Sequence, residues 1–150
     1  NASQLIDEFA GGYHERMEEK FIFPNFRGNE RLGELIEVLR KQHLRGRQIA
    51  SQIYALAGTG DLAADPRRKK LANAADSYAR MYRAHAARED TEVFPMLRTA
   101  ISPSRFATLA KKFKSEEIDV LGAAGIDRII ERTVELEKEL GIHALSHYTP

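Results

Sequence analysis

The sequence contains no cysteine among its 150 residues. This absence excludes disulfide bonds, thiolate metal ligands and cysteine nucleophiles. It is compatible with a reducing compartment, and we expect a cytoplasmic location. No apolar run approaches the roughly 18 residues that a membrane-spanning helix needs. The formal net charge is only +1, with basic and acidic residues interspersed, so we expect neither nucleic acid nor a membrane surface as a partner.

The length and composition are those of one ordinary globular domain. A chain of 150 residues suits a single core, and the hydrophobic fraction of 43% and charged fraction of 30% are typical of such proteins. The first residue, Asn1, is not an initiator methionine, and helical periodicity begins within a few residues of it. Since nothing like a signal peptide precedes that pattern, we expect the chain to begin inside a larger natural protein.

Apolar residues recur at helical spacing along most of the chain, and no segment has the alternation of a strand. Pro24 is expected to end the first helix, and Gly58 to be the left-handed residue after the second. Asp65-Pro66 has the residues of an N-cap and a first helical position, while Pro95 is expected near the end of the third helix. The predicted helices are residues 3–23, 30–57, 66–98, 104–121 and 126–140, with Gly122 and Gly125 separating the last two.

Three long helices with short connections predict antiparallel neighbours in an all-α, up-down bundle. The C-terminal helices contain no group of residues that indicates chemistry. They are expected to cap the bundle, to cover its open side, or to make a dimer contact.

One short pattern occurs twice, with an offset of 71 residues. Residues 14–24 and 85–95 both read His-x-x-x-Glu-acidic-x-x-β-branched-Phe-Pro. Residues four apart share a helix face, so each histidine points the same way as its glutamate, beside an apolar stripe. A buried carboxylate or imidazole is costly unless it is paired or bound to a metal. We expect the Phe-Pro ends to terminate each helix and to pack an aromatic ring under the site.

A third histidine, His43, continues the apolar stripe of Leu35 and Leu39 on the second helix. In an up-down-up order the first and third helices are parallel and diagonal, so the two half-sites face each other across the core. This arrangement suits two metal ions bridged by two carboxylates. His43 precedes His85 by 42 residues, and an equivalent histidine for His14 falls before residue 1. A helix carrying one more ligand is therefore expected to be missing.

Nitrogen and oxygen ligands without sulfur suit iron, manganese or zinc. The zincin order His-Glu-x-x-His and the ferritin-like order Glu-x-x-His both fail here. A single His-x-x-x-Glu is usually a solvated pair, so a purely structural role for each pair is the alternative. Two matching copies with a histidine between them favour a metal site.

The two copies, with Gln42-His43 between them, resemble the hemerythrin-like (HHE cation-binding) domain over about residues 1–100. The resemblance implies a hemerythrin-like bundle and two non-haem iron ions, with manganese or zinc as alternatives. It adds Glu15, an acidic position that sometimes contributes a ligand, and Asp90, where oxygen-carrying hemerythrins have a bridging aspartate. The ligands that it implies are His14, Glu18, His43, His85 and Glu89.

The chain departs from that family pattern in two ways. The family's first helix, with its own histidine, is absent, and Arg47 occupies the place of a second histidine that the oxygen carriers have. The domain division implied is a metal-binding bundle over residues 1–100, incomplete at its N-terminus, with residues 101–150 as a helical extension packed on it. A site poorer in histidine, and partly empty where a helix is missing, disfavours simple oxygen storage.

Three functions remain as hypotheses. The first is a di-iron protein that senses or handles iron, oxygen or redox signals, with metal ions and dioxygen or another small diatomic as its partners. The second is an oxidoreductase that uses the same site on oxygen, peroxide or nitric oxide. The third is an interaction module without metal, whose histidine–glutamate pairs are only structural. Whichever function applies, the missing helix would expose an apolar side, which a homodimer or the C-terminal helices would cover.

Overall fold

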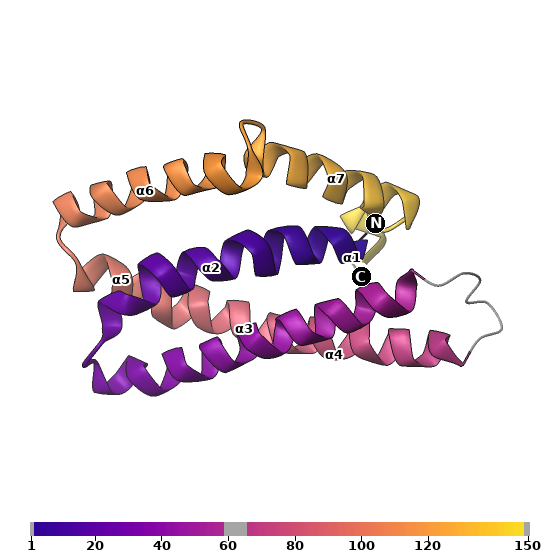
Figure 1. The fold of residues 1–150 in the computed structure, drawn as a ribbon, viewed down its shortest axis with the longest axis horizontal. Coiled ribbons are helices and arrows are strands. Elements are labelled where there is room, and N and C mark those ends of the chain that lie inside the picture. Colours follow the sequence, from indigo (N-terminus) through magenta and orange to yellow (C-terminus); the bar gives the residue numbers. More distant parts are fainter. Residues whose placement is uncertain (1, 59–65, 149–150) are drawn as a thin grey trace.

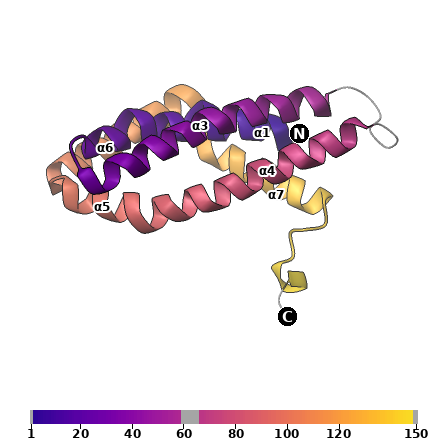
Figure 2. The same cartoon turned by 90° about the horizontal axis from the view of Figure 1, so that it is seen from below.

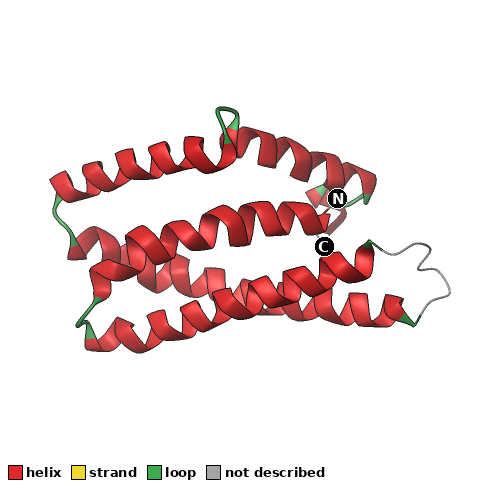
Figure 3. Cartoon of the chain, in the orientation of Figure 1, coloured by secondary structure: helices red, strands yellow, loops and turns green. Residues whose placement is uncertain are grey.

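The computed structural model describes residues 2–58 and 66–148, which form long helices joined by short turns (Figure 1). Those residues contain no strand (Figure 3), so the all-α prediction is confirmed. Within the same ranges, none of the helices combines the length and apolar character that crossing a lipid bilayer requires.

The first helical rod is almost continuous but changes its winding several times. Pro24 lies in the first turn of the closing 3₁₀ segment, as expected for a residue without an N–H. The Asn25 side-chain amide donates to the carbonyls of Phe21 at 2.6 Å and Ile22 at 2.9 Å, which caps the end of the rod. Its segments are α1 (Ala2–Leu5), the π-helix η1 (Ile6–His14), α2 (Glu15–Met17), the π-helix η2 (Glu18–Ile22) and η3 (Phe23–Phe26).

The second rod is the single helix α3 (Glu30–Ala57), which has the predicted limits. It begins at an N-cap, since the Asn29 side chain accepts a hydrogen bond from Leu32 N at 3.0 Å. The prediction that Gly58 is left-handed is wrong. Its φ is −80° and its N–H donates to Tyr54 O at 3.1 Å, so Gly58 still has helical geometry.

The third rod consists of α4 (Arg67–Arg88), the π-helix η4 (Glu89–Val93) and α5 (Phe94–Ala100). The N-cap predicted at Asp65 lies outside the described residues. Pro95 does not break the rod, because it lies in the first turn of α5, directly after the π-helical segment.

The fourth rod is formed by α6 (Pro103–Leu121) and α7 (Gly125–Glu139), followed by the short 3₁₀ segment η5 (Leu145–Tyr148). The Ser102 hydroxyl accepts a hydrogen bond from Arg105 N at 3.2 Å and caps α6. Gly122 has a φ of 81°, which lets the chain turn between the two helices.

The rods alternate in direction. The first rod and α4 run the same way, α3 runs against both, and α6 and α7 run back along the first rod (Figures 1 and 2). An ion pair between Lys20 and Glu116, with Nζ and Oε1 2.7 Å apart, joins α6 to the first rod. Arg128 of α7 pairs with Glu8 of η1 in the same way.

Two apolar clusters lie on either side of the middle of α3. Each fully buried large side chain in them stabilises the fold by roughly 1.5–3 kcal/mol. Buried histidine and glutamate side chains lie between these clusters, so packing on both sides holds them in place. One cluster comprises Ile22, Phe23, Phe26, Leu32, Ile36, Leu39, Val93 and Leu97, and the other comprises Ile49, Ile53 and Ala74.

Candidate metal centre

The repeated motif of the sequence is also a repeat of backbone geometry. Both π-helical segments begin at the motif glutamate and end just before Phe-Pro, so η2 and η4 have the same offset as the sequence copies. The N–H of Phe23 donates to Glu18 O, and that of Phe94 to Glu89 O, five residues back in each case. Short π-helical segments are rare in proteins overall, and those that occur are often at functional sites.

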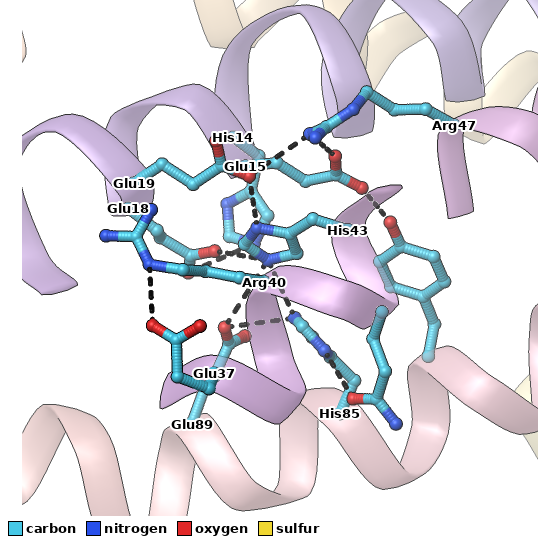
Figure 4. A network of polar contacts seen from close by, with 12 residues as sticks. His14, Glu15, Glu18, Glu19, Glu37, Arg40, His43, Arg47, His85 and Glu89 are labelled. Atoms are coloured by element: carbon cyan, nitrogen blue, oxygen red, sulfur yellow. Dashed lines mark hydrogen bonds and ion pairs between the residues drawn. The ribbon is translucent and has the colours of Figure 1, made fainter. Parts of the chain in front are cut away.

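Four of the predicted ligands come together in the core (Figure 4). Glu18 comes from the first rod, His43 from α3, and His85 and Glu89 from the third rod. One ligand atom of each lies within 4.8 Å of the others. Every one of the four residues is at most 2% exposed, which is unusual for titratable side chains.

The spacing of the ligand atoms fits a bound metal ion. His43 Nε2 lies 3.1 Å from His85 Nε2 and 3.4 Å from Glu18 Oε2. His85 Nε2 lies 3.0 Å from Glu89 Oε1. Ligands at about 2.0–2.2 Å from one ion are separated from each other by about 3–3.5 Å. Three separations in the cluster therefore match those of a coordination sphere, while His43 Nε2 and Glu89 Oε1 are 4.0 Å apart.

The outer nitrogens of the two imidazoles have acceptor partners that orient the rings. Glu19 Oε1 lies 2.9 Å from His43 Nδ1, and Gln42 Oε1 lies 3.0 Å from His85 Nδ1. Since a carboxylate only accepts hydrogen bonds, the proton of His43 is on Nδ1 and its Nε2 lone pair faces the cluster. Such outer partners orient metal-binding histidines in the same way. With an acceptor also on its Nδ1, His85 presents the same kind of lone pair.

The carboxylates of the cluster are buried without the hydrogen bonds that would offset the cost of burial. Both oxygens of Glu18, and Oε1 of Glu89, are buried without a hydrogen-bond partner in the described part of the chain. Burial, followed by the negative charge of Glu89, raises the pKa of Glu18 to about 8 against the opposing effect of His14. Four electron-rich atoms thus face one point without a donor between them, and a cation at that point would remove the penalty. The donor set fits a metal ion.

His14 lies at the edge of this cluster, not inside it. Its side chain is 41% exposed, its ring stacks on Phe9, and its Nε2 is 3.5 Å from Glu18 Oε1. The two oxygens of Glu18 therefore face different histidines, Oε1 toward His14 and Oε2 toward His43. This is the disposition of a carboxylate able to bridge two ions.

The two reserve candidates have different positions. Asp90 is exposed and belongs to neither group of potential ligands found in the described residues. Glu15 is only 1% exposed and is grouped with Glu19 and His43 on the other side of the His43 ring. Burial raises the pKa of Glu15 to about 7, although His43 and Arg47 oppose the shift.

Sequence reasoning did not assign the residues that support the ligands. Glu19 was noticed only as an acidic residue of the motif, yet its carboxylate orients His43. Burial alone would raise its pKa, but hydrogen bonds from His43 and Arg47 hold that pKa below its ordinary value. Tyr82 of α4 donates its hydroxyl to Glu15. The spacing of four residues between Glu15 and Glu19 was the available indication, because it places both on one face.

Phe-Pro closes the first rod as predicted, whereas the third rod continues through Phe94 and Pro95 as α5, so the prediction that each copy ends its helix is wrong for the second copy. Phe23 is 2% exposed and stacks on His43, with ring centroids 5.5 Å apart and an angle of 15° between the rings. Phe94 is only partly buried and packs against the first apolar cluster.

The part of the chain that contains these residues matches a known domain family. Residues 1–97 match the sequence model of the hemerythrin HHE cation-binding domain. The chain is 37% identical over 149 residues to the uncharacterised protein Rv1995 of Mycobacterium tuberculosis H37Rv and to Mb2018 of Mycobacterium bovis. The alignment covers 99% of this chain but 58% of each relative, so the chain spans little more than half of their length. No solved structure matches the chain significantly.

Proposed function

The chain belongs to the hemerythrin HHE cation-binding domain family, and on that premise we propose that it is a non-haem di-iron protein that senses or handles iron, oxygen or redox signals. The observation that carries the proposal is the Glu18 carboxylate, whose two buried oxygens have no hydrogen-bond partner and face His14 and His43. A buried carboxylate in this state is stabilised best by cations on both of its sides.

The two metal positions in this proposal are unequal. The first ion would be held by Glu18, His43, His85 and Glu89, which are all buried. Glu19 and Gln42 orient the two histidine rings through their outer nitrogens. The second ion would be held by His14 and by the other oxygen of Glu18, at the partly exposed edge of the cluster. Iron at these positions would supply one-electron redox chemistry and open places for a small diatomic ligand.

The residues around the centre support sensing more than storage. His14 is 41% exposed while His43 is fully buried, so a small molecule would reach the pair of ions from the His14 side. The other ligand residues are buried between the two apolar clusters, which would keep water away from a first ion held there. The site also has fewer histidines than the oxygen carriers that it resembles, since Arg47 stands where they have another.

Metal content tests the proposal directly. The purified chain should be freed of metal, loaded with Fe²⁺ without oxygen, desalted and then analysed for iron. We expect up to two irons per chain, and a ligand-to-metal absorption band after exposure to air. His85→Ala should lose most of the iron and the band, because it removes a ligand of the buried set.

A matched control separates ligation from general effects of losing a histidine. His143 is exposed, and His143→Ala should keep the iron and the absorption band of the parent protein. A folded parent protein that takes up no iron would overturn the proposal. Equal loss of iron in His85→Ala and His143→Ala would count against the assigned site.

A further inference from the structure

A second group of potential ligands lies on the other side of the His43 ring. Glu15, Glu19 and His43 each offer a ligand atom within 4.8 Å of the others. By composition alone, two carboxylates and an imidazole resemble the first group. The two groups differ in what already occupies them.

The guanidinium of Arg47 fills this second group (Figure 4). Its Nη1 lies 2.5 Å from Glu15 Oε2 and 3.2 Å from Glu19 Oε1. The other oxygen of Glu15 accepts a hydrogen bond from the Tyr82 hydroxyl. Both oxygens of Glu15 are thus compensated, whereas neither oxygen of Glu18 is.

The surrounding backbone makes room for this arrangement. A Cβ on Gly46 would lie 2.5 Å from the Tyr82 hydroxyl oxygen, and a Cβ on Gly11 would lie 3.2 Å from Cγ of Arg47. Glycine at these two positions lets Tyr82 and Arg47 approach Glu15 closely. Arg47 is 36% exposed, but its guanidinium reaches inward to Glu15 through space that these glycines leave open.

The formal charges lead to the same distinction. Glu15 and Glu19 have the permanent charge of Arg47 between them, so a divalent ion there would leave a net positive charge beside a nearly buried carboxylate. No arginine or lysine of the described ranges pairs with Glu18 or Glu89, so a divalent ion there balances two carboxylates. Bringing a metal ion next to this guanidinium, beside the buried carboxylate of Glu15, is unfavourable because the two positive charges repel each other.

We infer that Arg47 is a fixed internal cation that closes the Glu15–Glu19 side of His43 to metal ions and so confines them to the Glu18 side. The inference rests on the proposed function for the identity of the Glu18 side as the metal centre. It makes Arg47 a residue that determines where metal binds and how many ions the chain holds.

The test counts metal ions with Co²⁺ as the probe. Arg47→His removes the guanidinium and places an imidazole four residues after His43, on the same face of α3. We expect this variant to bind one more Co²⁺ per chain than the parent, by elemental analysis after desalting and by a change in visible absorption. Arg45→His, an exposed position on the same helix, is the matched control and should bind as the parent does.

The role of Glu15 is tested in both backgrounds. Glu15→Gln should leave the Co²⁺ count of the parent unchanged, because Glu15 is engaged by Arg47 and Tyr82. In the Arg47→His background the same change should abolish the additional ion. Absence of the additional ion in a folded Arg47→His protein, or loss of an ion in Glu15→Gln alone, would overturn the inference.

Failure of the proposed function gives a different result. If the parent and Arg45→His bind no Co²⁺, the proposed metal centre is wrong. In that case, binding of one ion by Arg47→His still supports the role of Arg47. If Arg47→His also binds no ion, the role of Arg47 is refuted. If Arg47→His does not fold, as judged by circular dichroism, Glu15→Gln in the parent chain decides between the two outcomes.

Discussion

In the metal-free protein, the buried carboxyl of Glu18 should make folding less favourable as the pH rises. Burial raises its pKa to about 8, against the ordinary value of 4.5, so the folded state retains a proton that the unfolded chain loses. The protonated carboxyl is tolerated below pH 4.5, and stability is lost progressively as the pH rises toward about 8. A bound metal ion would abolish this loss, because it takes the place of the proton.

The size of this loss of stability follows from the pKa of Glu18 in the folded protein, about 8, and its ordinary value of 4.5. At about 1.4 kcal/mol per pH unit, the loss amounts to about 3 kcal/mol at pH 7 and approaches about 5 kcal/mol above pH 8. These are large fractions of the 5–15 kcal/mol that typically stabilises a whole domain. Glu18→Gln keeps the shape and removes the charge, so it should recover most of this free energy in the metal-free protein.

The assay is urea unfolding of the metal-free parent protein and of Glu18→Gln at several pH values between 5 and 8. Unfolding is monitored by circular dichroism. We expect the variant to be the more stable one at pH 7, with a difference that shrinks toward pH 5. The same variant should bind less iron than the parent. Glu34→Gln, at an exposed position of α3, is the control and should change neither quantity. A Glu18→Gln protein that is less stable than the parent at pH 7 without metal would refute the reasoning.

Changes at four further positions test how the rods pack against one another. Phe23→Ala should cost about 3–5 kcal/mol in urea unfolding, because it empties a buried place against His43; a cost below that of Phe23→Leu would contradict this. Gly46→Ala should destabilise by about 1–3 kcal/mol, since its Cβ meets the Tyr82 hydroxyl. Gly33→Ala on the same helix meets nothing within 4 Å and should be stabilising or neutral in the same measurement. A hydrogen bond from Arg128 holds the pKa of Glu8 below its ordinary value despite partial burial, so the pair stabilises the fold at neutral pH and is lost in acid. Glu8→Gln should therefore speed amide exchange in α7 at neutral pH, with no difference from the parent once Glu8 is protonated.

Much of the fold was predictable because local chemistry decides it. Helix α3 runs from Glu30 to Ala57 as its apolar periodicity indicates, and Pro24 lies at the end of the first rod because it lacks an N–H. The winding of the rods was not predictable in this way. The π-helical segments η2 and η4 depend on how Glu18 and Glu89 are turned toward the core, and helical spacing alone does not distinguish them from α-helix.

The candidate ligands illustrate the same division. Spacing of four residues was sufficient to pair His14 with Glu18 and His85 with Glu89, since that geometry lies within one helix. Whether each residue is inside or at the edge depends on how the rods pack. His14 is 41% exposed although its motif partner His85 is buried, because the two copies face different neighbours.

The residues that act across helices are those that only packing reveals. The two histidine–glutamate pairs, the all-helical fold and the absence of thiolate ligands follow from the residues and their spacing, because each is a local property of the chain. The partners of those residues come from other rods. Glu19 behind His43, and Arg47 and Tyr82 around Glu15, are brought together from helices that are far apart in sequence. Their roles depend on distances of about 3 Å, which tertiary packing sets and which no periodicity along the chain contains.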